Sequence, residues 1–198
     1  AYEISACLVG SEMCIRDNDM SIAENHGGLY KNLKLLRDTD GKAECNLFRA
    51  MGLDYVFVKD GNDIPSLIAA FRQVKDSTKP VVVHIVTQKG KGYELAEQHK
   101  EQWHWCMPFD PATGKTTVSF GGDGDFGSFT CEYLQKKMAE DKRVCAITSA
   151  TPTVFGFTED IRKKAGKQFI DVGIAEEQAA AMASGIAKNG GKPFWGVY

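Results

Sequence analysis

The 198-residue sequence has no excess of charge of one sign, because 24 lysines and arginines stand against 26 aspartates and glutamates. Proteins that bind nucleic acid or an anionic membrane usually carry a basic patch, so neither partner is expected. Long hydrophobic runs are also missing: the longest, VVVHIV at 81–86, is much too short to cross a bilayer. No basic start leads into an apolar stretch, so we expect no secretory signal and a cytoplasmic protein.

Cysteine pairs at metal-binding or redox spacing are absent too. The six cysteines are scattered, with no C-x-x-C, at positions 7, 14, 45, 106, 131 and 145. This pattern excludes a zinc motif and makes a disulfide framework improbable at this size. We therefore expect no metal site built from cysteine, and reduced thiols that are mostly buried.

Helical and strand patterns alternate along the chain from residue 18 onward. The apolar run PVVVHIV at 80–86 is typical of a strand buried on both faces of a parallel sheet. Asp63 followed by Pro65 marks a helix start, and Gly52 closes the preceding helix. We predict helices at 28–39, 42–52, 63–77, 128–141 and 175–189, and strands at 54–58, 80–86, 143–149 and 193–198. This alternation predicts a doubly wound α/β fold.

The stretch from 88 to 126 interrupts this alternation, since it is rich in glycine, proline, tryptophan and charge. It is predicted to be a long loop followed by a linker, after which a second α/β unit begins. GGDGD at 121–125 suggests a phosphate or metal loop, but no strand precedes it and no asparagine follows one βα unit later. A flexible linker is therefore the favoured interpretation of these glycines.

The opening of the chain has no clear period. Its segment CLVGSEMCIRD at 7–17 resembles translated sequencing-adaptor sequence. We therefore set residues 1–16 aside from the fold, in the way that processing segments are set aside. The alternative is a genuine but irregular N-terminus.

Two segments carry residues suited to binding. DNDMSIAEN at 17–25 offers carboxylate and amide oxygens, which are hard ligands for Mg²⁺, although a turn before a helix is the favoured interpretation of these residues alone. In the loop at 88–115, glycines 90 and 92 allow a ligand to approach the backbone closely. His104, between two tryptophans, is either a proton donor near neutral pH or a loop histidine bonded to backbone.

The segment DVGIAEEQAAAMASGIA at 171–187 places two adjacent carboxylates, Glu176 and Glu177, at a predicted helix start. Negative charge is favoured there because unpaired backbone N–H groups gather at the start of a helix. The alternative is that one glutamate is held in a dry pocket to move a proton. The residues alone leave both interpretations open.

Four blocks in the same order resemble the 1-deoxy-D-xylulose-5-phosphate synthase family, which belongs to the transketolase-like superfamily that depends on thiamine diphosphate. They are DNDMSIAEN at 17–25, KGKGY at 89–93, WH..MPFDPATG at 103–114 and DVGIAEEQA at 171–179. The resemblance implies a thiamine-diphosphate-binding fold made of parts of two doubly wound parallel-sheet domains. Residues 17–118 would be the back part of the diphosphate-binding domain, 119–126 a linker, and 127–198 the truncated start of the pyrimidine-binding domain.

The resemblance also implies roles for single residues. Asn18 and the carbonyl of Met20 would bind Mg²⁺, and Tyr93 would contact thiamine diphosphate. Glu176 would bond to the aminopyrimidine ring of the cofactor, so that the ring can take a proton from the thiazolium carbon. This role requires a dry site and leads us to expect a raised pKa for Glu176. His104 would act near the substrate in proton transfer.

The function implied is a transferase of a homodimeric enzyme. It condenses pyruvate, with loss of CO₂, and glyceraldehyde 3-phosphate to 1-deoxy-D-xylulose 5-phosphate, for isoprenoid precursor, thiamine and pyridoxal biosynthesis. The chain departs from the family pattern at Trp105, where glycine is usual, and at Gln178, where histidine is usual. The upstream G-D-G of the family is missing, so these residues alone are expected to be inactive. The alternatives are a non-catalytic split or degenerate subunit, and another transketolase-like transferase.

Overall fold

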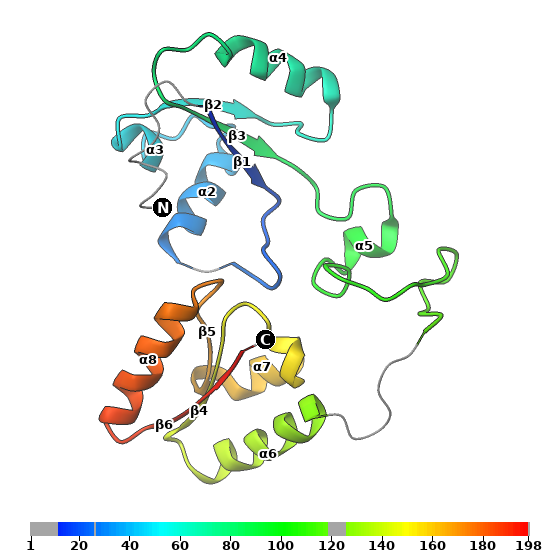
Figure 1. Cartoon of the computed structure of the whole chain (residues 1–198), viewed down its shortest axis with the longest axis vertical. Coiled ribbons are helices and arrows are strands. Elements are labelled where there is room, and N and C mark those ends of the chain that lie inside the picture. The colour runs from blue at the N-terminus through cyan, green and yellow to red at the C-terminus, as the bar shows by residue number, and fades with distance from the viewer. Residues whose placement is uncertain (1–11, 26, 119–125, 198) are drawn as a thin grey trace. The chain divides into compact units, whose positions relative to one another are not determined.

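A computed structural model of the chain describes residues 12–25, 27–118 and 126–197 (Figure 1). The contacts divide it into two compact units. The first unit holds the described residues up to Met20 together with Asn25–Trp103. The second holds Ser21–Glu24 and the residues from His104 onward. The linker predicted at 119–126 and the GGDGD segment lie almost wholly outside the described residues, since only Phe126 is described.

The first unit is built on a parallel three-stranded sheet in the order β1-β3-β2, in which β3 is the buried central strand. The strands are β1 (Glu12–Asp17), β2 (Asp54–Val58) and β3 (Val81–Val86), and the helices are α2 (Gly28–Asp38), α3 (Leu47–Ala50), α4 (Ile64–Val74) and α5 (Glu94–Gln98). Alternate residues of β3 face opposite sides. Val83 packs in the cluster with α4, whereas Val82 packs in the cluster with α2 and α3. Figure 1 shows α4 on one face of this sheet and α2 and α3 on the other.

The sequence predicted α2, α4, β2 and β3, and the structure confirms them. The Asp63 carboxylate accepts the Ser66 N–H at 2.8 Å, as a helix N-cap should. The helix predicted at 42–52 is wrong in its first half. It begins only at Leu47, because the buried side chain of Asn46 accepts the N–H groups of Phe48 and Arg49 and so fixes the helix start there.

The exclusion of residues 1–16 from the fold also needs correction. Glu12–Asp17 forms β1, which pairs in parallel with β3 along its whole length. Residues 1–11 lie outside the described residues. An irregular start therefore does not describe the segment from Glu12 onward.

The second unit contains another parallel three-stranded sheet, in the order β5-β4-β6. The strands are β4 (Val144–Thr148), β5 (Phe169–Asp171) and β6 (Lys192–Gly196); the helices are α6 (Phe126–Glu140), α7 (Glu159–Ala165) and α8 (Glu176–Lys188), with 3₁₀ turns η1 (Pro152–Phe155) and η2 (Gly166–Gln168). Helices α6 and α7 pack on one face of β4 and α8 packs on the other (Figure 1). The sequence predicted α6, β4, α8 and β6, but not β5 or α7.

Two broader expectations can be compared with the structure. None of the five cysteines in the described ranges is in a disulfide, but only Cys131 and Cys145 are buried, so the expectation of mostly buried thiols is wrong. Among the described residues, none of the helices combines the length and the apolar character that crossing a membrane requires. The chain is thus an α/β structure with parallel sheets, as predicted.

Candidate functional site

The carboxyl end of β1 leads into a polar turn in the first unit. Asp17 ends the strand and is buried, with 6% of its surface exposed. Its Oδ2 accepts hydrogen bonds from Arg37 Nη1 at 2.5 Å and from His84 Nε2 at 2.9 Å, while its Oδ1 accepts the Asp19 N–H at 3.0 Å. Burial acts to raise the pKa of Asp17, but these hydrogen bonds outweigh it and hold the pKa well below its usual range.

The turn itself places the two predicted Mg²⁺ ligands next to each other. One end of the Asn18 side-chain amide lies 2.5 Å from the carbonyl oxygen of Met20, and the other end lies 3.0 Å from Arg16 Nη1. The hydrogen-bond partners assign the amide nitrogen to the Met20 side and the oxygen to the Arg16 side. Turning the amide over would set two hard oxygens side by side, which is the donor chemistry that Mg²⁺ prefers. Only in that turned orientation would Asn18 and Met20 offer a cation two oxygens on the same side.

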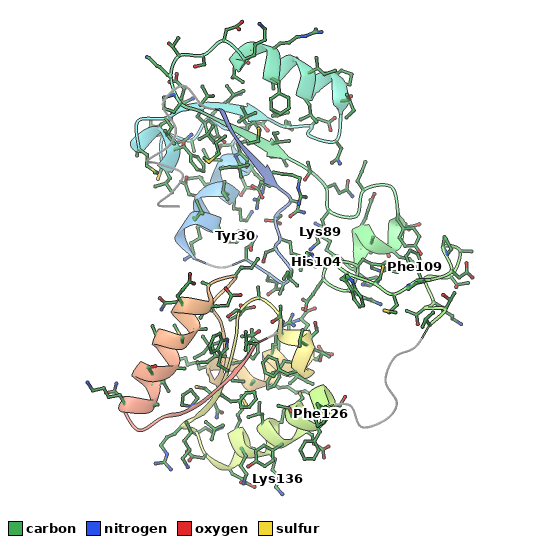
Figure 2. The ribbon with its side chains drawn as sticks, viewed as in Figure 1. Tyr30, Lys89, His104, Phe109, Phe126 and Lys136 are labelled. Carbon is green, nitrogen blue, oxygen red and sulfur yellow. The ribbon has the colours of Figure 1, made fainter. Side chains whose placement is uncertain are left out.

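Side chains from α2 cover this turn. Tyr30, labelled in Figure 2, donates to Asp19 Oδ1 at 3.2 Å, and Arg37 bonds to both Asp17 and Asp19. Asp19 adopts a left-handed backbone with φ 67°, which is uncommon for a residue other than glycine. In the parts of the chain that the structure describes, no cluster of three or more His, Cys, Asp or Glu side chains could hold a metal ion. A cation here would depend on amide and carbonyl oxygens.

The loop after β3 carries the second predicted block. Gly90 has φ 80°, and a Cβ there would lie 2.5 Å from the backbone carbon of Ala96, so only glycine fits. Tyr93 stands at the N-cap position of α5 with its ring edge-on to Trp103, the centroids being 5.0 Å apart. Burial lowers the pKa of Lys89, and the Arg16 guanidinium lowers it further. Lys89 is labelled in Figure 2. Sequence reasoning gave Lys89 no role, although it lies in the KGKGY block.

In the second unit, the carboxyl ends of β4 and β5 frame the start of α8. Asp171 Oδ1 accepts the N–H groups of Ala150 at 3.0 Å and Gly173 at 2.9 Å. Glu176 and Glu177 are the first two residues of α8, and both are exposed. Their place in the first helical turn agrees with the favourable effect of the helix dipole on acidic side chains.

The remaining predicted residue lies in the loop between α5 and α6. His104 is exposed, and so is its neighbour Trp105, with 73% of its surface accessible. The structure thus brings Asn18 and Met20 together in the first unit, with Tyr93 on a loop of that unit. His104 and Glu176 belong to the second unit.

A groove of about 670 Å³ in the first unit lies elsewhere. It is lined by residues at the amino ends of β2 and β3, including Asp54 and Val81, together with Arg49 from α3 and Gln73 from α4. Ligands of open α/β sheets bind beyond the carboxyl ends of the strands. The turn at Asn18 is therefore the better candidate site.

Comparison with known proteins agrees with the motifs. A family model described as 1-deoxy-D-xylulose-5-phosphate synthase matches residues 38–87. A 1-deoxy-D-xylulose-5-phosphate synthase of Listeria monocytogenes is 36% identical over 199 residues, covering 96% of this chain and 32% of the relative. The protein named 1-deoxy-D-xylulose-5-phosphate synthase 1 of Geobacter sulfurreducens is 39% identical over 152 residues, covering 77% of this chain and 24% of the relative.

A third relative, from Symbiobacterium thermophilum, is 41% identical over 152 residues, with 76% of this chain and 23% of the relative aligned. The chain spans about a quarter to a third of the length of the curated relatives it matches. Over that span, the resemblance predicted from the four blocks is confirmed: the chain is homologous to part of the 1-deoxy-D-xylulose-5-phosphate synthases.

Proposed function

We propose that this chain belongs to a transferase that condenses pyruvate, with loss of CO₂, and glyceraldehyde 3-phosphate to 1-deoxy-D-xylulose 5-phosphate. The observation that carries the proposal is the similarity over nearly the whole chain to relatives named for this activity. The product would serve isoprenoid precursor, thiamine and pyridoxal biosynthesis in the cytoplasm. A homodimer is part of the proposal, and so are domains at 17–118 and 127–198 that form a thiamine-diphosphate-binding fold.

The proposed cofactors are thiamine diphosphate and Mg²⁺. Thiamine diphosphate, when bound, supplies an electron sink for breaking and forming carbon–carbon bonds. The Asn18 amide oxygen and the Met20 carbonyl oxygen would bind Mg²⁺ after the Asn18 amide turns over, because the amide nitrogen otherwise faces the Met20 carbonyl. Tyr93 would contact the cofactor from the loop that follows β3.

Proton transfer would fall to two side chains. The Glu176 carboxylate, at the first position of α8, would share a proton with the aminopyrimidine ring of the cofactor. Glu177 would only benefit from the helix start. His104 would hold or donate a proton at an imidazole nitrogen near the substrate, and its exposed position in the loop leaves it accessible.

A chimera would test the proposed function. The matching segment of the Listeria monocytogenes relative, which aligns with 96% of this chain, would be replaced by residues 17–197. The chimera should form 1-deoxy-D-xylulose 5-phosphate from pyruvate and glyceraldehyde 3-phosphate with thiamine diphosphate and Mg²⁺. A folded chimera that transfers ketol groups between sugar phosphates would favour a transketolase instead. A folded chimera with neither activity would favour the non-catalytic subunit.

A further inference from the structure

We infer that Tyr55 and His84 are positioning residues for the turn Asn18–Met20. They hold the turn in place through a buried chain of hydrogen bonds, Tyr55–His84–Asp17, that ends on the turn. The role of the turn in binding a cation rests on the proposed function. The positioning itself rests on the contacts within the first unit.

This hydrogen-bond chain runs across the sheet from β2 through β3 to the end of β1. The Tyr55 hydroxyl lies 2.6 Å from His84 Nδ1, and His84 Nε2 lies 2.9 Å from Asp17 Oδ2. The His84 side chain is completely buried and meets the Phe57 ring edge-on, with the centroids 5.4 Å apart. No substrate can therefore reach the imidazole, so any effect on a site must act through Asp17.

The partners settle which nitrogen carries the hydrogen. Asp17 Oδ2 also accepts from the Arg37 guanidinium, a cation that can only donate and that favours the ionised carboxylate, so His84 Nε2 donates to Asp17 as well. In the neutral imidazole Nδ1 is then the acceptor, and the Tyr55 hydroxyl donates to it. Each polar group of the Tyr55–His84–Asp17 hydrogen-bond chain has a partner. Buried polar groups need such partners in order not to destabilise the fold.

The Asp17 carboxylate, held by His84, in turn fixes the backbone of the turn. Asp17 Oδ1 accepts the Asp19 N–H at 3.0 Å, and Asp19, between Asn18 and Met20, has a left-handed φ of 67°. Such a conformation persists only where its surroundings fix it. The Thr87 N–H also donates to the Asp17 carbonyl at 2.8 Å, which ties the end of β1 to the residue after β3.

Two substitutions of His84 separate positioning from packing. The amide nitrogen of a glutamine can stand where Nε2 stands and donate to Asp17, whereas an asparagine is too short. His84→Gln should therefore preserve the turn and His84→Asn should release it. Tyr55→Phe removes only the hydroxyl that fixes the imidazole. His99→Gln changes an exposed histidine of the same unit and serves as the control.

The experiment is hydrogen exchange followed by NMR on the whole chain, with the exchange rate of the Asp19 amide as the readout. We expect His84→Asn to speed exchange by about tenfold and Tyr55→Phe by several-fold, while His84→Gln and the control stay within about twofold. Exchange at Val83, in the centre of β3, reports whether each variant is still folded. Unchanged Asp19 exchange in folded His84→Asn and Tyr55→Phe would overturn the inference.

Line broadening by Mn²⁺ on the same samples separates the inference from the proposed function. In the unmodified chain Mn²⁺ should broaden the signals of Asn18 and Met20, and His84→Asn should weaken this effect while His84→Gln preserves it. Faster Asp19 exchange in His84→Asn supports the positioning even where Mn²⁺ broadens nothing in the unmodified chain. An unmodified chain in which Mn²⁺ broadens no signal would contradict only the cation-binding role of the turn, which belongs to the proposed function.

Discussion

Asp171 connects two strand ends at the start of α8, and its replacement tests that arrangement. One carboxylate oxygen accepts both the Ala150 N–H and the Gly173 N–H. Ala150 is completely buried and has a left-handed φ of 64°, so this hydrogen bond also supports a strained backbone. Asp171→Ala would leave the Ala150 N–H buried without a partner, whereas Asp171→Asn keeps an oxygen in place.

The size of the effect follows from the two hydrogen bonds. A buried N–H without a partner costs about 1–3 kcal/mol, and the half-exposed Gly173 N–H adds about 0.5–1.5 kcal/mol because water can partly replace the carboxylate. Asp171→Ala should therefore lower the free energy of unfolding of the second unit by about 1.5–4.5 kcal/mol. Asp171→Asn should lower it by about 1 kcal/mol or less, since it loses only the charge.

Urea unfolding followed through the NMR signal of the Trp195 indole reports on the second unit, because that indole donates to Ser149 Oγ at 3.3 Å. The midpoint should fall clearly for Asp171→Ala and little for Asp171→Asn, with the slope unchanged. Equal midpoints for Asp171→Ala and Asp171→Asn would refute the reasoning, because they would show that the oxygen kept by asparagine does not hold the turn.

Three further predictions concern the first unit and the whole chain. Because the pKa of Asp17 is held low in the folded state, its stabilising effect is complete above about pH 5 and is lost progressively as the pH falls further. Asp17→Asn should therefore flatten the acid dependence of unfolding between pH 5 and 2.5, and an unchanged slope would contradict this. Gly41→Ala should lower the free energy of unfolding of the first unit by about 2–4 kcal/mol, because φ is 74° and the new Cβ would lie 2.5 Å from Phe57 Cβ. Gly28→Ala, with open space around it, is the matched control in the same denaturation assay, and equal losses would refute the packing argument. The chain by itself should form no 1-deoxy-D-xylulose 5-phosphate from pyruvate and glyceraldehyde 3-phosphate with both cofactors, and measurable turnover in a product assay would show this to be wrong.

Sequence reasoning succeeded where local signals decide the structure. The helix α4 carries its own start in Asp63 and Pro65, and the apolar run of β3 needs no partner to be read as a buried strand. It failed at β1 and β5. The residues of β1 are placed by pairing with β3, more than sixty positions later in the chain, and β5 is only three residues long.

The candidate site divides in the same way. Asn18 and Met20 stand within one short motif, so the sequence could propose them together. Asp17, Tyr55 and His84 are far apart in the sequence and come together only through the strand register, in which His84 lies opposite Ile15 of β1 and Phe57 of β2. No spacing rule predicts that meeting. It depends on the pairing of three parallel strands.

The most direct test of the proposed function compares the two adjacent carboxylates that begin α8. In the chimera that carries residues 17–197, Glu176→Gln and Glu177→Gln would be measured side by side for formation of 1-deoxy-D-xylulose 5-phosphate. A residue that moves a proton in the reaction contributes about 100-fold or more, whereas a helix-start charge affects only stability. We predict that Glu176→Gln loses about 100-fold or more in kcat and that Glu177→Gln stays within a few-fold. Full activity of a folded Glu176→Gln chimera would contradict the proposed function of this chain.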